Sequence, residues 1–301
     1  PGPGAEGGRI VFQGPLAGLL ADAGSPTGAF LSGRRTVAAR DPAAALRPRD
    51  PSRCLRLRNV REHNLKGFDL EIPSDRIVAV SGVSGSGKST LVNDVLHPAL
   101  CRALGRAVEQ AGACDALEGA GALADVVLVD QSPIGKTARS NPASFVGAFD
   151  AIRKCFARLP EARKRGFSYG DFSFNAGKGR CPACAGTGFE LVEMQFLSDV
   201  YLRCEECGGR RYRGEILAVR IPWEGRMLSI ADVLDLTVRE ALQAFAAESA
   251  VVRALRPLED VGLGYLRLGQ PVPTLSGGEA QRLKLAGHLA EEAAAKTQGR
   301  K

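Results

Sequence analysis

The pattern of apolar and polar residues predicts a chain that mixes strands and helices. Residues 54–58 (Cys-Leu-Arg-Leu-Arg) and 68–72 (Phe-Asp-Leu-Glu-Ile) alternate with the period of a half-exposed strand, and the second run stops at Pro73. Apolar runs at 76–81 and 124–129 predict two further strands. From residue 54 onward the sequence therefore favours an α/β fold.

Helical periodicity dominates the second half of the chain. Residues 141–160 follow this period after Pro142, and the signal returns from 228 to 258, with Thr237 and Glu240 spaced as a capping box. A last helix is predicted over 280–292. Between these helices, residues 165–215 are rich in Gly, Cys, aromatic residues and Arg, which indicates a small inserted module. One face of the first helix carries an apolar stripe, which we interpret as part of the hydrophobic core and not as a functional site. The stripe consists of Phe145, Phe149, Ile152 and Phe156.

Residues 1–50 carry little apolar content of their own and are rich in Gly, Ala and Pro. A short strand at 9–12 and a short helix at 14–23 are predicted here. The segment is interpreted as the tail of an earlier domain or as a flexible arm. A dense basic stretch follows. It is interpreted either as a solvated linker and strand edge or as a contact for nucleic acid. Its basic residues are Arg47, Arg49, Arg53, Arg56, Arg58 and Arg61.

A phosphate-binding loop stands between a predicted strand and a predicted helix. Residues 82–89 read Gly-Val-Ser-Gly-Ser-Gly-Lys-Ser, the G-x-x-x-x-G-K-[ST] pattern. Its glycines let successive N–H groups point at phosphate oxygens, and the helix N-terminus adds its positive dipole end. Lys88 is expected to reach the β- and γ-phosphates of ATP, and the Ser89 hydroxyl to hold Mg²⁺. The alternative is a Gly/Ser-rich turn that fits by chance. The residues predicted to bind ATP in this loop are Gly82, Ser84, Gly85, Ser86, Gly87, Lys88, Ser89 and Thr90.

Length and charge narrow the class of protein. The chain has 301 residues, which allows about two domains. Its 40 basic and 33 acidic residues give a net charge of +7, which suits a polyanionic partner. No apolar run is long enough to span a bilayer, and the chain starts at Pro1 without a signal peptide, so we expect a cytoplasmic protein with no membrane partner.

Four of the eight cysteines have metal-ligand spacing. They form C-x2-C-x19-C-x2-C, which falls in the range of a structural zinc site. Four thiolates close a tetrahedron around Zn²⁺ and leave no open position for catalysis. The alternative is free buried cysteines or a redox pair. Cys54, Cys101, Cys114 and Cys155 lack such spacing and are interpreted as small core residues. The predicted ligands are Cys181, Cys184, Cys204 and Cys207.

A second anion-binding motif precedes the last predicted helix. Residues 275–279 read Leu-Ser-Gly-Gly-Glu and match the signature of ABC-type ATPases, which binds the γ-phosphate held by the phosphate loop of an opposing domain. Gln131, at the end of the 124–129 strand, fits the Q-loop glutamine of that family and joins Lys88 and Ser89 as a predicted catalytic residue. The signature residues predicted to contact ATP are Ser276, Gly277, Gly278 and Glu279.

Asp130 supports a competing interpretation. The run at 126–130 resembles a Walker B strand, whose Asp helps to hold Mg²⁺ in a generic P-loop NTPase. In an ABC ATPase, however, that strand lies after the signature. The Ser-Gly-Gly-Glu sequence therefore favours the ABC interpretation, in which Asp130 simply precedes the Q-loop.

Taken together, these motifs resemble the UvrA family of excinuclease ABC proteins, the DNA-damage-recognition ATPases of nucleotide-excision repair, or a divergent paralogue within it. The resemblance runs almost continuously through residues 54–290. It implies an ATPase that binds double-stranded DNA irrespective of sequence, works as a homodimer with ATP, Mg²⁺ and Zn²⁺, and hands the lesion to a helicase-like partner. The stretches that carry it are 82–90, 130–135, 139–143, 174–175, 179–182, 268–271 and 275–282.

The resemblance also implies an organisation in four parts. Residues 1–50 match the tail of a preceding ATPase half with a linker, and 51–140 the nucleotide-binding core. Residues 141–260 match an inserted helical and zinc-binding module, and 261–301 the signature and its helix. The chain ends at Lys301, before the family's Walker B Asp-Glu and switch His, so we expect a truncated C-terminal half that hydrolyses ATP poorly, although the parent protein is an ATPase. Residues 136–138 depart from the family and point to a paralogue.

Basic residues near the Q-loop are the predicted DNA contacts. The family resemblance puts this region on the DNA-facing side, while ordinary surface charge is the alternative for any single residue. Two rival functions remain: an ABC-type ATPase of another process, such as transport, and a non-catalytic zinc or DNA-binding module. The zinc module and the basic charge argue against the first, and the phosphate loop against the second. The predicted DNA contacts are Lys136, Arg139, Arg153 and Lys154, with Arg203, Arg210, Arg211 and Arg213 beside them.

Overall fold

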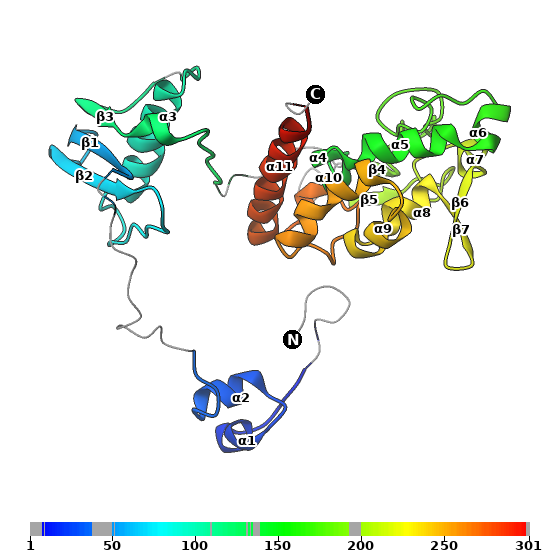
Figure 1. The fold of residues 1–301 in the computed structure, drawn as a ribbon. Helices are drawn as coiled ribbons and strands as arrows, with labels where there is room; N and C mark the ends of the chain where they lie inside the picture. The colour runs from blue at the N-terminus through cyan, green and yellow to red at the C-terminus, as the bar shows by residue number, and fades with distance from the viewer. Residues whose placement is uncertain are drawn as a thin grey trace. The chain divides into compact units, whose positions relative to one another are not determined.

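The computed structural model describes residues 8, 10–37, 50, 52–108, 110–130, 132, 134, 139–192 and 200–298. The chain divides into two compact units, which Figure 1 shows with their elements labelled. Unit 1 comprises Pro1–Ile10 and Val129–Lys301, and unit 2 comprises Val11–Leu128. Both helices and strands are present, as an α/β protein requires.

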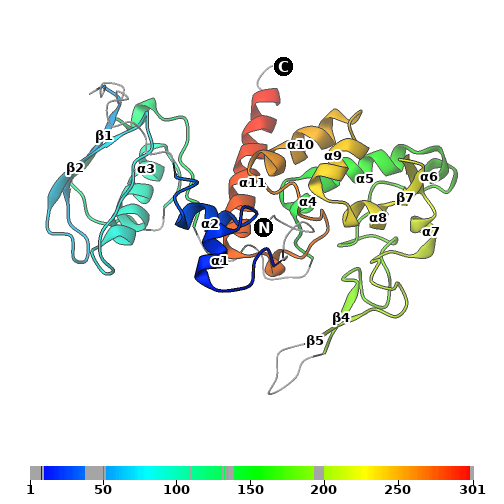
Figure 2. The same cartoon turned by 90° about the horizontal axis from the view of Figure 1, so that it is seen from below.

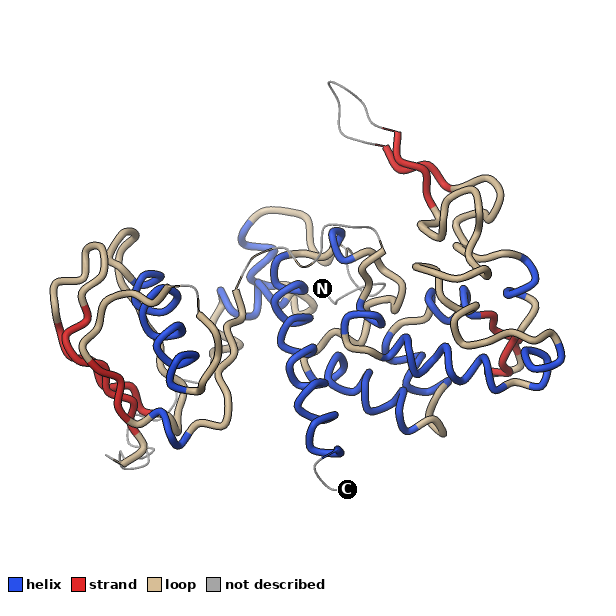
Figure 3. Tube along the Cα trace, turned by 90° about the horizontal axis from the view of Figure 1, so that it is seen from above, coloured by secondary structure: helices blue, strands red, loops and turns tan. Residues whose placement is uncertain are grey.

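Unit 2 is built on a small antiparallel sheet with the strand order β2-β1-β3. The sequence predicts β1 (Cys54–Val60) and β2 (Phe68–Pro73) correctly, whereas β3 (Ala116–Glu118) is not foreseen. One face of the sheet is covered by a helix that runs as a π-helix, η2 (Thr90–Leu96), into α3 (His97–Ala103). In Figure 3 these strands lie in red beside the blue helix. The core between them is apolar: Leu57, Val60, Leu91 and Val95.

Two predicted strands of unit 2 are wrong. Residues 76–81 and 124–129 join no sheet among the described parts of the chain. The side chain of Ile77 is fully exposed, and Val78, Val80 and Val127 are all more than 40% exposed. A strand is stable only when neighbours pair with its backbone and cover its side chains, and the described residues supply neither for these runs.

Two short helices precede the sheet, α1 (Leu16–Ala21) and α2 (Pro26–Leu31), where one helix over 14–23 is predicted. Ser25 caps α2 by accepting a hydrogen bond from the Gly28 N–H at 3.1 Å. Gly28 lets the two helices approach, because a Cβ there would stand 2.0 Å from the Leu19 carbonyl oxygen. A 3-10 turn, η3 (Ala120–Ala122), follows β3. The strand predicted at 9–12 does not form over the described residues 10–12.

Unit 1 is mainly helical and has one large apolar core. The helix predicted over 141–160 breaks at Gly147, whose φ of 73° is left-handed, into α4 (Pro142–Phe145) and α5 (Ala148–Arg158). Its predicted core stripe is confirmed for Phe149, Ile152 and Phe156, while Phe145 is 39% exposed. The other helices are α6 (Pro160–Lys164), α7 (Gly214–Leu217), α8 (Ile230–Asp235), α9 (Val238–Ala244), α10 (Ser249–Asp260), η4 (Val272–Thr274) and α11 (Gly277–Gln298).

Local signals place two helix starts in unit 1. The predicted capping box at the start of α9 is confirmed, since the Thr237 hydroxyl accepts from the Glu240 N–H and the Glu240 carboxylate accepts from the Thr237 N–H at 2.8 Å. Ser229 and Asp232 form the same arrangement for α8.

Two antiparallel hairpins complete unit 1. Between the two cysteine pairs, β4 (Phe189–Val192) and β5 (Val200–Arg203) form a hairpin, which Figure 2 shows leaving the helical body of the unit. The hairpin of β6 (Arg220–Trp223) and β7 (Arg226–Ser229) is not foreseen. Among the described residues, no helix has both the length and the apolar character that crossing a membrane requires.

Candidate functional site

The predicted phosphate loop of unit 2 forms a glycine-rich turn that runs directly into a helix. Gly85 and Gly87 have φ values of 78° and 92°, a left-handed conformation that glycine adopts without strain. The Lys88 ammonium lies over this turn and donates to the carbonyl oxygens of Gly82 at 3.0 Å and Val83 at 2.7 Å. The motif thus forms a glycine-rich turn followed by a helix, the local order that the sequence predicts, and its assignment to phosphate binding stays a prediction.

Asn64 supports the phosphate loop, and no local sequence pattern predicts this role. Its side-chain amide donates to the Gly85 carbonyl oxygen at 2.8 Å. Gly87 packs against the same segment, because a Cβ there would stand 2.7 Å from Leu65 Cδ2 and 2.9 Å from Asn64 Oδ1. The last glycine of the motif is thus required by packing as well as by its backbone conformation.

The signature motif of unit 1 forms the exposed start of α11, where Ser276, Gly277 and Gly278 are all accessible. Glu279 points back and accepts hydrogen bonds from the Ser276 N–H at 2.8 Å and the Ser276 hydroxyl at 2.9 Å. The Tyr265 hydroxyl donates to the same carboxylate at 2.6 Å. Burial acts to raise the pKa of Glu279, but these hydrogen bonds outweigh it and lower the pKa below its ordinary value. Glu279 therefore completes a capping box with Ser276, the residue that caps the start of the signature helix.

Lys284 on the signature helix binds Asp130, and no local sequence pattern predicts this contact either. The Lys284 ammonium forms an ion pair with the Asp130 carboxylate and donates to the Ser132 carbonyl oxygen at 2.7 Å and hydroxyl at 2.8 Å. The hydrogen bond from Lys284 lowers the pKa of Asp130, and a bond from Ser132 lowers it further. Asp130 is thus engaged by α11 of its own unit. Gln131, the predicted Q-loop glutamine, lies outside the described residues.

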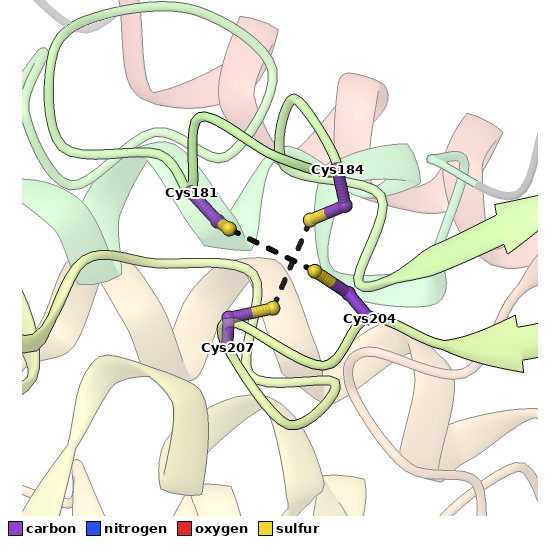
Figure 4. A group of neighbouring side chains, drawn as sticks. All are labelled: Cys181, Cys184, Cys204 and Cys207. Carbon is purple, nitrogen blue, oxygen red and sulfur yellow. Dashed lines mark hydrogen bonds between the residues drawn. The ribbon is translucent and has the colours of Figure 1, made fainter.

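The four predicted zinc ligands come together at one point in unit 1. Figure 4 shows their sulfur atoms facing a common centre, and all four lie within 4.8 Å of one another. The sulfur atoms of Cys181 and Cys204 are 3.9 Å apart, and those of Cys184 and Cys207 are 3.7 Å apart. A tetrahedron with Zn–S bonds of 2.3 Å has edges of about 3.8 Å. The cluster therefore fits a tetrathiolate metal ion.

Backbone donors prepare these sulfur atoms for a metal. The Gly188 N–H donates to Cys184 Sγ at 3.2 Å, and the Arg211 N–H donates to Cys207 Sγ at 3.4 Å. Burial would raise the pKa of Cys184, but the N–H groups of Gly188 and Gly186 outweigh it and lower the pKa to about 7. Burial raises the pKa of Cys207 to about 12. The first thiol is thus partly ionised near neutral pH, while a bound metal would displace the proton of the second.

The four remaining cysteines are not members of this cluster. Cys54 and Cys101 are buried as predicted, and Cys114 and Cys155 are partly buried.

The predicted DNA contacts differ in whether their charged groups are exposed or already bound to other groups of the protein. Lys154 is exposed on α5, whereas Lys136 lies outside the described residues. The Arg139 guanidinium donates to the Ala185 carbonyl oxygen at 3.1 Å. Arg153 stands over the rings of Phe149 and Tyr169, 5.6 Å and 5.2 Å from their centres, and pairs with Asp150. In the zinc module Arg203 and Arg213 are exposed, Arg210 pairs with Asp232 at 2.6 Å, and Arg211 is buried.

No protein-family model matches this chain. Its relatives include UvrABC system protein A of Thermus thermophilus, 51% identical over 297 residues, which are 99% of this chain and 30% of that protein. The proteins of the same name from Streptomyces avermitilis and Methanothermobacter thermautotrophicus are 50% and 49% identical over the same length. The crystal structure of UvrA2 from Deinococcus radiodurans superposes with a TM-score of 0.83 at 46% identity, covering 96% of this chain and 34% of that one.

These relatives bear out the family that the motifs suggested, and the UvrA2 structure bears out the predicted ABC-type fold. The chain spans about 30% of the length of the curated relatives that it matches. This protein belongs to the UvrABC system protein A family and corresponds to about 30% of the length of those relatives.

Proposed function

We propose that this chain is the nucleotide-binding and zinc-bearing part of a protein that recognises DNA damage for nucleotide-excision repair and uses ATP to do so. The observation that carries the proposal is the 51% identity to UvrABC system protein A over 99% of the chain, phosphate loop and signature included. The protein acts in the cytoplasm, and the parent protein hydrolyses ATP.

ATP and Mg²⁺ bind at the phosphate loop of unit 2. Lys88 contacts the β- and γ-phosphates and Ser89 holds Mg²⁺, while Gln131 remains the predicted Q-loop glutamine. The N–H groups at the start of α11, together with Ser276, contact the γ-phosphate held by an opposing domain. The protein therefore works as a homodimer, and a helicase-like repair protein receives the lesion.

Zinc has a structural task in this proposal. Four sulfur ligands fill a tetrahedron and leave no position for substrate. The cluster closes the base of the β4–β5 hairpin, because the Cys204 N–H donates to the Gly188 carbonyl oxygen at 3.1 Å and the Cys181 N–H donates to the Arg211 carbonyl oxygen at 2.9 Å. Zinc thus holds this part of unit 1 in one conformation.

The partner is double-stranded DNA, bound irrespective of sequence. A damage sensor must read the backbone and its deformability, because lesions share no pattern of base edges. The net charge of +7 suits such a partner. Lys136, Arg139, Arg153 and Lys154 are the proposed contacts. Lys154 is the best test residue among the described three, since Arg139 and Arg153 already make contacts within the protein.

A DNA titration at several salt concentrations tests this proposal. Replacing Lys136 and Lys154 by Ala should reduce the slope of log K against log salt by about two units, one for each lost phosphate contact. The matched control replaces Arg163 and Lys164, two exposed residues of α6, and removes the same charge. Equal slopes in the wild type and in the first variant, with both folded by circular dichroism, would show that Lys136 and Lys154 do not contact DNA.

A further inference from the structure

Arg211 carries a buried charge without a carboxylate partner. The residue is 7% exposed, and its guanidinium stands 5.0 Å over the ring of Phe174. One nitrogen, Nη2, donates to the Gly269 carbonyl oxygen at 3.2 Å, while Nη1 is buried and has no hydrogen-bond partner. Across the described residues, no carboxylate comes within ion-pair distance of this side chain. A buried cation without a counter-charge is costly, so this charge requires an explanation.

The backbone of Arg211 connects it to both halves of the cysteine cluster. Its N–H donates to Cys207 Sγ at 3.4 Å, and its carbonyl oxygen accepts from the Cys181 N–H at 2.9 Å. The left-handed φ of 70° at Arg211, unusual for a residue with a side chain, belongs to this turn. Four thiolates around one Zn²⁺ leave a net charge of about −2. With zinc bound, a buried dianion would thus lie on the same short turn as the buried cation.

We infer that the Arg211 guanidinium is the internal counter-ion of the zinc–thiolate centre and couples that centre to the segment leading into the signature motif. The inference rests on the proposed zinc site and adds a residue that is not a metal ligand. The guanidinium balances the thiolate charge on one side and holds the Gly269 carbonyl on the other. Gly269 lies in a tight turn, where its N–H donates to the Leu234 carbonyl oxygen at 2.7 Å, and η4 and Ser276 follow within seven residues.

Asp235 is the competing counter-ion. Its residue lines the same cavity as Arg211, although it forms no ion pair with it. The two assignments predict different effects of zinc. If the metal centre balances the charge, the benefit of Arg211 exists only while zinc is bound. If Asp235 balances it, the benefit is the same with and without zinc.

The test compares zinc affinity and thermal stability in the full 301-residue chain. The variants are Arg211→Met, which removes the charge and keeps a long apolar side chain, and Arg211→Lys, which keeps the charge without the planar fork. Arg213→Met removes an exposed charge two residues away and serves as the matched control. Asp235→Asn tests the competing counter-ion. Zinc affinity is measured by competition with a chromophoric chelator at fixed pH, and melting is followed with zinc and with excess chelator.

We expect Arg211→Met to weaken zinc binding by about 10- to 100-fold, the usual effect of losing a residue that supports metal ligands. Arg211→Lys should retain most of the affinity, and Arg213→Met and Asp235→Asn should leave it unchanged. The melting temperature of Arg211→Met should fall in the zinc-loaded protein and stay equal to or above that of the wild type once zinc is removed.

Other results would overturn the inference. Unchanged zinc affinity in Arg211→Met, or an equal loss of stability with and without zinc, would assign Arg211 a purely structural role. A loss of thermal stability in Asp235→Asn that is equal with and without zinc would transfer the counter-charge to that residue. If Arg211→Met does not fold, an Arg211→Lys variant that folds but has lost zinc affinity would contradict the inference as well. A wild-type protein that binds no zinc would instead refute the proposed metal site itself.

Discussion

The cap of the signature helix offers a sharp test of how unit 1 prepares its proposed nucleotide contact. In Glu279→Ala, the Ser276 N–H and hydroxyl and the Tyr265 hydroxyl all lose the carboxylate that now accepts from them at 2.6–2.9 Å. The Ser276 hydroxyl can still accept from the N–H of residue 279, so what is lost is the acidic half of the capping box, and hydrogen bonds to a charged group contribute about 1–3 kcal/mol. We therefore expect the first turn of α11 to be destabilised by about 1–3 kcal/mol, which corresponds to about 5- to 150-fold more frequent opening.

Hydrogen exchange measured by mass spectrometry on a peptide covering residues 275–283 reports this opening directly. Glu279→Gln keeps one acceptor without the charge and should give a smaller effect than Ala. Glu291→Ala, which removes a highly exposed carboxylate later on the same helix, is the control and should leave this peptide unchanged.

The pH dependence of the cap has a defined sign. Because the folded pKa of Glu279 is lowered, its stabilisation is fully present above the unfolded value of about 4.3 and is lost as the pH falls through the folded pKa. Exchange of the 275–283 peptide in Glu279→Ala that matches the wild type at neutral pH would refute the reasoning.

Three further predictions concern zinc, Lys284 and Asn64. Atomic absorption should find about one zinc per wild-type chain; Cys184→Ser should lose it, whereas Cys155→Ser should keep it, and metal-free wild-type protein would contradict the site. In Lys284→Gln the ion pair to Asp130 is absent, so NMR should find the pKa of the Asp130 carboxyl raised toward its ordinary 3.8, with Lys154→Gln as the unchanged control; an identical pKa in both proteins would argue against the contact. Asn64→Ala removes the amide that holds Gly85, and we expect ATP affinity to fall by about 5- to 10-fold, the value of one hydrogen bond; full affinity in a calorimetric titration would show that the loop does not need it.

What the sequence predicted well is encoded over short distances. The two C-x2-C pairs, the Thr237–Glu240 capping box and the alternation in β1 and β2 each depend on residues only a few positions apart, and the structure confirms them. The glycine-rich turn with its lysine likewise needs no distant partner to be recognised. Such local patterns are informative because the physical interaction and the sequence spacing coincide.

What the sequence missed depends on contacts between distant residues. Lys284 meets Asp130 across 154 positions, and Asn64 meets Gly85 across 21, and neither pair leaves a periodic trace. The predicted strands at 76–81 and 124–129 failed for the same reason, since an apolar run forms a strand only where another segment pairs with it. The break at Gly147 was missed because a helical stripe continues through it and hides the left-handed residue.

Binding of ATP–Mg²⁺ at the phosphate loop is the measurement that tests the account most directly. Calorimetric titration compares the wild-type chain with Lys88→Ala and with Lys66→Ala, an exposed lysine of the same unit that serves as the control. Removing the Lys88 ammonium deletes a charge-assisted hydrogen bond to phosphate worth about 1.5–3 kcal/mol, so affinity should fall about 10- to 150-fold. Lys66→Ala should bind like the wild type. Equal affinity in the wild type and Lys88→Ala would contradict the assignment of residues 82–90 as the nucleotide site.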